Sequence, residues 1–174
     1  MKVFWSWQCD TPGSIGRHLI REALAEAITG AAGGGTLYEA SREEGRSDAA
    51  GPSGIGPPEL GRRIFRQIRE CDIFVADLTV PGAGEGSPGK EEACNPDVAI
   101  ELGYFRVVNG GADLIIVLNT AFTRRDLSIR PFGGSPWLAT YDLPEGSARP
   151  EIGRARKALV EKIGGADGAG RTFH

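Results

Sequence analysis

Short runs of apolar residues alternate along this chain with longer segments in which apolar residues recur every three or four positions. The short runs are rich in β-branched and aromatic side chains and predict strands at residues 2–7, 36–40, 73–78, 114–119 and 137–141. The longer segments have the period of an α-helix. We expect helices from about Ser14 to Gly30, from Pro57 onward, from Pro96 to Val108 and over residues 150–163. Strands that alternate with helices predict a parallel sheet with helices on both faces.

The runs at 73–78 and 114–118 are almost entirely apolar, which is typical of parallel strands that are buried on both faces. Together with residues 3–7 they should form the centre of a five-stranded, mainly parallel sheet. Five such strands suit a flavodoxin-like α/β fold with the strand order 2-1-3-4-5. We expect a single domain over residues 1–163, followed by a glycine-rich tail at 164–174.

The predicted strand order reverses between the first and third strands, and ligands bind beyond the carboxyl ends of the strands at such a point. Polar and aromatic residues stand at both of these strand ends. They are Ser6, Trp7, Gln8 and Asp10 at the first strand, and Asp77 and Thr79 at the third. We therefore expect this edge of the sheet to bind a ligand. The glycine- and proline-rich connection at 79–94 should flank it as a lid.

The helix expected from Pro96 brings an acidic residue toward this edge. Asn95 can cap the helix through its side-chain oxygen, and proline is favoured at the first helical position. The apolar stripe of the helix passes through Val98 and Phe105, and Glu101 borders that stripe. A carboxylate in this position is either held by hydrogen bonds in a cleft or has a raised pKa, and both conditions favour a catalytic or ligand-binding role.

Asp97 lies one turn before Glu101, and Tyr104 lies nearly one turn after it, so two acids and a phenol line one face of the helix. In the alternative interpretation, Glu101 keeps its carboxylate in water and Asp97 only complements the helix dipole. The aromatic rings of Trp7 and Tyr104 would then be ordinary core residues. The combination of the three side chains favours a site with Glu101 as its catalytic residue.

The composition does not indicate a nucleic-acid or membrane partner. The chain carries 20 Lys plus Arg against 23 Asp plus Glu, a formal net charge of −3, and it has no apolar run near the ~20 residues that a membrane helix needs. Three cysteines without metal-ligand spacing fit a reducing compartment, and the N-terminus has no signal-peptide pattern. We expect a soluble, cytoplasmic protein without a metal ion. In the helix from Pro57 the apolar residues should face inward and the arginines outward; the apolar residues are Leu60, Ile64, Phe65 and Ile68.

The chemistry that remains open to this sequence is that of carboxylates. No glycine-rich fingerprint opens any of the expected helices, and no Walker loop is present. His18 lies inside the first expected helix and His174 at the terminus, so mechanisms that pair Ser or Cys with His, and zinc hydrolysis, are poorly supported. One or two acids suffice to cleave or exchange a glycosidic bond through a cation-like transition state. A nucleoside or NAD, with a good leaving base, would be a suitable substrate, and no cofactor is expected.

Four segments carry a resemblance to known proteins: residues 3–8, 75–79, 95–104 and 117–122. They resemble bacterial TIR-like proteins. The Asp-Leu-Thr and Asn-Pro-x-Val-x-x-Glu-Leu-Gly-Tyr patterns are also similar to nucleoside 2-deoxyribosyltransferase-like proteins. The matches span most of residues 1–142, and the block that contains Glu101 is the most specific of them. Cys9 stands where a serine is common, and the insert at 81–94 is enlarged.

The resemblance implies a flavodoxin-like, TIR-like domain that cleaves the N-glycosidic bond of NAD or a related nucleotide, in a role in bacterial antiphage defence. Glu101 matches the catalytic glutamate, and Asp77 matches the acid after the third strand. Asp77 and Asp97 would hold ribose hydroxyls. Two alternatives stay open: a nucleoside 2-deoxyribosyltransferase or nucleosidase, and a non-catalytic module that senses a nucleotide or self-associates. A homo-oligomer or an activating partner protein is compatible with each.

Overall fold

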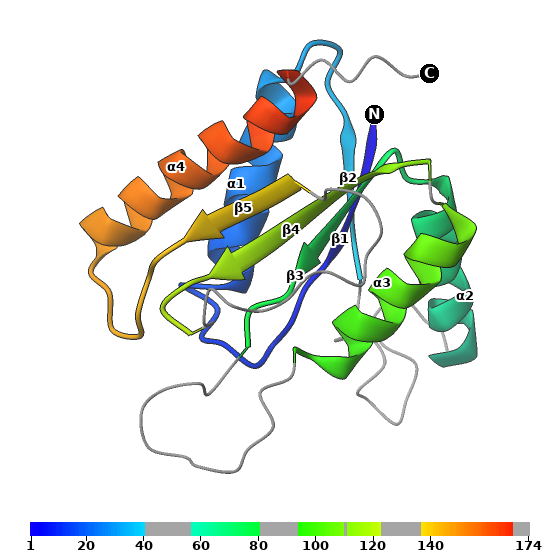
Figure 1. Cartoon of the computed structure of the whole chain (residues 1–174), viewed down its shortest axis with the longest axis horizontal. Coiled ribbons are helices and arrows are strands. Elements are labelled where there is room, and N and C mark those ends of the chain that lie inside the picture. Colours follow the sequence, from blue (N-terminus) through cyan, green and yellow to red (C-terminus); the bar gives the residue numbers. More distant parts are fainter. Residues whose placement is uncertain (41–56, 81–93, 110, 123–136, 169–174) are drawn as a thin grey trace.

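The computed structural model describes residues 1–40, 57–80, 94–109, 111–122 and 137–168, which form a parallel sheet flanked by helices (Figure 1). The strands are β1 (Lys2–Ser6), β2 (Thr36–Glu39), β3 (Ile73–Asp77), β4 (Asp113–Asn119) and β5 (Trp137–Tyr141). The helices are α1 (Arg17–Gly30), α2 (Pro57–Glu70), α3 (Pro96–Val108) and α4 (Arg149–Gly168). Strands and helices alternate from β1 to β4, as the apolar pattern predicts.

The five strands follow the order β2-β1-β3-β4-β5, and every neighbouring pair is parallel. The predicted flavodoxin-like order and the parallel sheet are confirmed. In the centre of the sheet Phe4 of β1 stands opposite Phe74 of β3, which stands opposite Leu114 of β4. The strand order reverses between β1 and β3, so the carboxyl ends of these two strands form the edge at which a ligand is expected.

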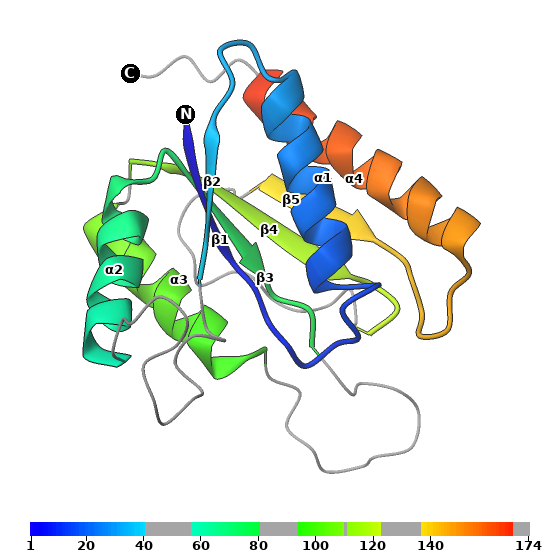
Figure 2. The same cartoon turned by 180° about the vertical axis from the view of Figure 1, so that it is seen from behind.

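The helices form two layers, one on each face of the sheet. Helices α1 and α4 pack against each other on one face, and α2 and α3 pack against each other on the opposite face (Figures 1 and 2). The prediction of helices on both faces is therefore confirmed. None of the helices in the described ranges is long and apolar enough to cross a membrane.

An aromatic stack joins the sheet to α3. The rings of Phe4 and Phe74 are stacked with their centroids 5.5 Å apart, and Phe74 stacks in turn on Phe105 of α3 at 4.5 Å. All three side chains are fully buried. Because Phe105 lies one turn after Glu101, this stack fixes α3 against β1 and β3 and so fixes the position of Glu101.

The ends of several elements differ from the expectation, most of them by one residue. Helix α1 begins at Arg17 and not at Ser14, because the Pro12 carbonyl accepts hydrogen bonds from the backbone N–H groups of Ile15 and Gly16 and forms a turn. Strand β1 ends at Ser6, one residue before Trp7. Helix α4 continues to Gly168, beyond the expected end at residue 163. The proposed lid at 79–94 lies mostly outside the described residues.

Candidate active site

The position of Glu101 follows from the way α3 begins. The Asn95 side chain accepts a hydrogen bond from the Asp97 backbone N–H at 3.0 Å, and Pro96 occupies the first helical position. The inner face of the helix is anchored by the buried side chains of Val98 and Phe105. Glu101 lies between them and is 6% exposed. The carboxylate is therefore inside the protein and not at a solvated rim.

Ser6, the last residue of β1, holds this carboxylate. Its hydroxyl donates a hydrogen bond to Glu101 Oε2, and its side chain is fully buried. Ser6 pairs in register with Ala76, one residue before the end of β3. The bond therefore places Glu101 above the carboxyl ends of β1 and β3, where the strand order reverses.

A second buried network joins the ends of β1 and β3. The Gln8 amide donates to the Thr79 carbonyl at 2.9 Å, and the Thr79 backbone N–H donates to Asp77 Oδ1 at 3.0 Å. The side chains of Gln8 and Asp77 are both fully buried, and Thr79 is almost so. Among the described residues, Gln8 Oε1 has no hydrogen-bond partner. The structure thus brings three of the predicted site residues together and leaves a buried acceptor beside them.

Asn119 extends this network and was not singled out from the sequence. Its backbone N–H donates to the Thr79 hydroxyl at 3.0 Å, and its side-chain amide donates to the Leu143 carbonyl at 2.9 Å. Asn119 ends the apolar run of β4 just as Asp77 ends that of β3. That shared pattern is the signal in the sequence by which Asn119 could have been found.

Tyr141 and Cys94 lie close to the Asp77 carboxylate. Burial raises the pKa of Tyr141 well above its ordinary value, and the negative charge of Asp77 raises it further. Burial also raises the pKa of the Cys94 thiol, with a smaller contribution from Asp77. The Tyr141 hydroxyl donates to the Ile15 carbonyl at 2.8 Å. Burial therefore disfavours the ionised form of both groups, which are neutral at physiological pH.

A third, more exposed group surrounds the start of α3. The Asn95 side-chain amide N–H donates to Asp10 Oδ2 at 2.6 Å. Its side-chain oxygen accepts from the Asp97 backbone N–H and so caps α3. Asp10 and Asp97 are both exposed. Asn95 therefore connects two of the predicted substrate-binding acids and ties the chain after β1 to α3, although the sequence indicated it only as a helix cap.

The two aromatic residues expected to contact a ligand differ in accessibility. Trp7 is 2% exposed; its indole N–H donates to the Ala40 carbonyl at 2.7 Å, and the Arg17 guanidinium lies 3.8 Å from the ring centroid. Tyr104 is partly exposed and lies against Phe65 of α2, with the ring centroids 4.6 Å apart. Phe65 itself is 37% exposed, so its predicted inward orientation is only partly met. Of the two aromatic residues, Tyr104 keeps the more accessible ring.

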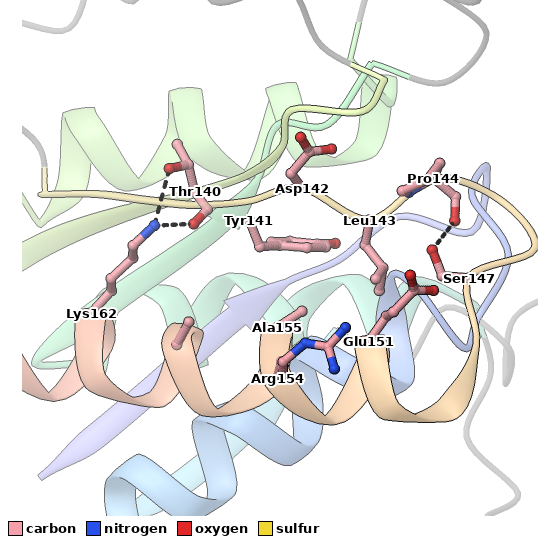
Figure 3. A pocket seen from close by; sticks show the side chains of 11 residues that line it. Thr140, Tyr141, Asp142, Leu143, Pro144, Ser147, Glu151, Arg154, Ala155 and Lys162 are labelled. Carbon is pink, nitrogen blue, oxygen red and sulfur yellow. Dashed lines mark hydrogen bonds between the residues drawn. The ribbon is translucent and has the colours of Figure 1, made fainter.

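A cavity of about 430 Å³ lies elsewhere, between the end of β5 and α4 (Figure 3). Lys162 and Arg154 line it together with Asp142 and Glu151, and the Lys162 amine donates to the Thr140 carbonyl and hydroxyl. Its two cations and two anions do not favour one charge class of ligand, and none of the predicted site residues lines it. Over the described part of the chain, no three metal-binding side chains come together.

Comparison with known proteins adds only distant similarities. No protein-family model matches the chain, and no curated protein matches its sequence. The fold is similar to a 2-desoxiribosyltransferase from Leishmania mexicana, at 15% identity and a TM-score of 0.45 over 67% of this chain and 63% of that one. The match therefore spans less than two thirds of the Leishmania protein.

Two further solved structures cover nearly the whole chain. They are the CMP N-glycosidase BcmB of Clostridium botulinum and Smu.1420 from Streptococcus mutans UA159. The first has 16% identity and a TM-score of 0.49 over 94% of this chain and 97% of that one. The second has 9% identity and a TM-score of 0.47 over 95% and 100%. Similarities of this size do not carry a functional assignment, which has to be argued from the site.

Proposed function

We propose that this protein cleaves the N-glycosidic bond of a nucleotide or nucleoside, with Glu101 as the catalytic carboxylate. The observation that supports this most is the position of Glu101. Its side chain is buried, accepts a hydrogen bond from Ser6, and lies where the strand order of the sheet reverses. Burial of a carboxylate costs stability unless it is compensated, and such a cost is typical of functional sites.

The reaction needs little beyond this carboxylate. As the bond between the sugar C1′ and the base nitrogen breaks, its electron pair leaves with the base and positive charge develops on the sugar. Glu101 either stabilises that charge or attacks C1′, and in the second case water then hydrolyses the glycosyl ester. A base that carries a positive charge before cleavage, such as the nicotinamide of NAD, leaves as a neutral molecule and needs no general acid.

The other residues of the site would bind the substrate. The carboxylates of Asp77 and Asp97 can accept hydrogen bonds from ribose hydroxyls. Gln8 Oε1, which is buried beside Thr79 and lacks a hydrogen-bond partner among the described residues, can accept from a hydroxyl or from a base N–H. Tyr104 has the more accessible ring for contact with a base. Ser6 would act through Glu101 by fixing the orientation of its carboxylate.

The sequence resemblance makes NAD the first substrate to test. Loss of NAD would halt an infected cell, so a role in antiphage defence is the cellular function that this substrate would imply. Exchange of one base for another is the same chemistry with a second base in place of water. The competing proposal is a module that binds a nucleotide without turnover, which would not need the Glu101 carboxylate.

The test compares wild type with Glu101→Gln and, as a matched control, with Glu161→Gln on the exposed surface of α4. Release of free base from NAD and from a panel of nucleosides and nucleotides is measured by chromatography, over a series of protein concentrations. Glu101→Gln should lower the rate by roughly 10²-fold or more with little change in melting temperature, and the control should match wild type. Turnover by Glu101→Gln at the wild-type rate would contradict the catalytic role. Nucleotide binding without cleavage by wild type would favour the binding module.

A further inference from the structure

The loop between β1 and α1, residues 7–16, is held from opposite sides of the sheet. Asn95, at the start of α3, donates its side-chain amide N–H to Asp10 Oδ2 at 2.6 Å. Tyr141, the last residue of β5, donates its hydroxyl to the Ile15 carbonyl at 2.8 Å. Helix α3 covers one face of the sheet, whereas Tyr141 lines the cavity beside α4 on the other face (Figures 1 and 3). Two elements on different faces therefore fix the same loop.

The second half of this loop is a compact turn. The Pro12 carbonyl accepts hydrogen bonds from the backbone N–H groups of Ile15 and Gly16, each at 3.1 Å. A Cβ at Gly16 would collide with Thr11 Oγ1, so no side chain fits there unless the turn rearranges. Thr11, Ile15 and Gly16 are all buried. Because the turn is packed so closely, a displacement at Ile15 is passed on to Asp10, which directly precedes it.

Asp10 is a residue of this loop that a substrate can reach, because its side chain is exposed. Asn95 occupies Oδ2, whereas Oδ1 makes only a weak contact with Cys9 Sγ at 3.9 Å. One carboxylate oxygen can therefore accept a hydrogen bond from a sugar hydroxyl or from a base N–H. Asn95 also caps the helix that carries Glu101, so its bond sets Asp10 at the same end of α3 as the site.

We propose that Tyr141 is a positioning residue of the candidate active site, an inference that rests on the proposed function. Its hydroxyl fixes the turn at 11–16, and the turn holds Asp10 beside α3 in the orientation that a hydrogen-bond donor of the substrate meets. Tyr141 does not contact the substrate itself, because it is 6% exposed and its hydroxyl is engaged by the Ile15 carbonyl. Its effect therefore appears in the affinity for substrate, and the bond-breaking step at Glu101 is left unchanged.

The hydroxyl of Tyr141, and not its ring, performs this role. Burial raises the pKa of Tyr141 well above its ordinary value, so the hydroxyl remains a donor at neutral pH. Ile15 is 2% exposed, so its carbonyl can reach water only if the turn moves. Tyr141→Phe keeps the ring in place but leaves this buried acceptor without a donor. The turn should then loosen while the sheet is unchanged.

Steady-state kinetics with a substrate that wild type cleaves test the role of Tyr141. Tyr141→Phe should raise KM roughly 10-fold, the size of one hydrogen bond, with kcat nearly unchanged. Tyr38→Phe, which removes a phenol hydroxyl within β2, is the matched control and should behave like wild type. In an Asp10→Ala background, Tyr141→Phe should not raise KM further, because the two changes act on the same contact. An unchanged KM for Tyr141→Phe, or an equal rise in KM with and without Asp10, would overturn the positioning role.

Hydrogen exchange of the full chain, followed by mass spectrometry, tests the loop without any substrate. Peptides over residues 9–16 should exchange faster in Tyr141→Phe than in wild type and in Tyr38→Phe, whereas peptides over β3 and β4 should exchange alike in all three proteins. A purely structural role would speed exchange across the sheet as well and lower the melting temperature. Unchanged exchange over residues 9–16, or faster exchange throughout, would therefore overturn the inference. The two proposals fail separately: no cleavage by wild type, together with faster exchange at 9–16 in Tyr141→Phe, would remove the proposed function and leave the hold of Tyr141 on the loop.

Discussion

The Ser6 hydroxyl and the Glu101 carboxylate, 95 positions apart in the chain, are joined by a buried hydrogen bond. The bond links the carboxyl end of β1 to the middle of α3 and so connects the sheet edge that binds ligands in this fold to the one acid of α3 that is buried. A carboxylate held in this way has a fixed orientation before substrate arrives. That preorganisation is the source of most electrostatic catalysis.

Replacing Ser6 by alanine should lower kcat and leave KM nearly unchanged. A hydrogen bond to a charged group contributes about 1.5–3 kcal/mol, which corresponds to roughly 10- to 100-fold in rate if it is needed in the transition state. Steady-state kinetics and thermal unfolding are measured together. Ser6→Thr keeps a hydroxyl and should recover part of the rate. A lowered melting temperature with unchanged kcat would show that Ser6 supports only the fold.

Asn95 performs two tasks that substitution can separate. Asn95→Ala removes the cap of α3 and the contact with Asp10, and it should cost about 1 kcal/mol of unfolding free energy. Asn95→Asp retains an oxygen that can accept from the Asp97 N–H, but it places a second carboxylate beside Asp10. We expect Asn95→Asp to be the more stable variant in urea denaturation at low pH, where carboxylates are protonated, with the difference shrinking at neutral pH. Equal stability of the two variants at every pH would exclude the capping role.

Cys71 makes stability depend on alkaline pH. Burial raises the pKa of its thiol from 9.0 to about 11, against the opposing effect of a hydrogen bond from Asn109. The unfolded chain therefore releases this proton at a lower pH than the folded protein. The contribution of Cys71 to stability is complete below pH 9.0 and is lost as the pH rises toward about 11.

Urea unfolding across this window measures the effect. Cys71→Ala should be less stable than wild type at neutral pH, because it loses the contact of Sγ with the Ile68 carbonyl, but its stability should fall less steeply above pH 9.0. Cys9→Ser, at an exposed position, serves as the control and should keep the wild-type slope. The same slope in all three proteins would mean that the Cys71 thiol is not responsible.

Much of the fold could be predicted from the sequence because its signals are local. The apolar runs that became β3 and β4 are continuous and sharply bounded, and Asn95-Pro96 marks the start of α3. Helical period alone places Glu101 beside the apolar stripe, and in the structure its side chain is buried there. Each of these features depends on residues within a few positions of one another.

The contacts that define the site could not be predicted, because they depend on how separate elements dock. The bonds from Ser6 to Glu101, from Gln8 to Thr79 and from Asn95 to Asp10 span 95, 71 and 85 positions. Helical period likewise could not show that Phe65 would meet Tyr104 across the α2–α3 contact and keep one side exposed. The pattern of apolar residues shows which side of an element is buried, but not which side chain it will meet.

Gln8 offers a test of substrate binding that is separate from catalysis. Its amide N–H donates to the Thr79 carbonyl, while Oε1 is buried and has no hydrogen-bond partner among the described residues. Methionine is similar in size to glutamine. Gln8→Met therefore removes one satisfied polar group, the amide N–H, and one unsatisfied polar group, Oε1, so the net change in unfolding free energy should be small. If Oε1 accepts a hydrogen bond from the substrate, KM should rise by about 10-fold, equivalent to about 1.4 kcal/mol, while kcat changes little because Glu101 is untouched. Steady-state kinetics with the best substrate and a melting curve decide this together. A melting temperature near that of wild type with an unchanged KM would remove Gln8 from the binding site, since a buried acceptor that contacts substrate cannot be deleted without loss of affinity.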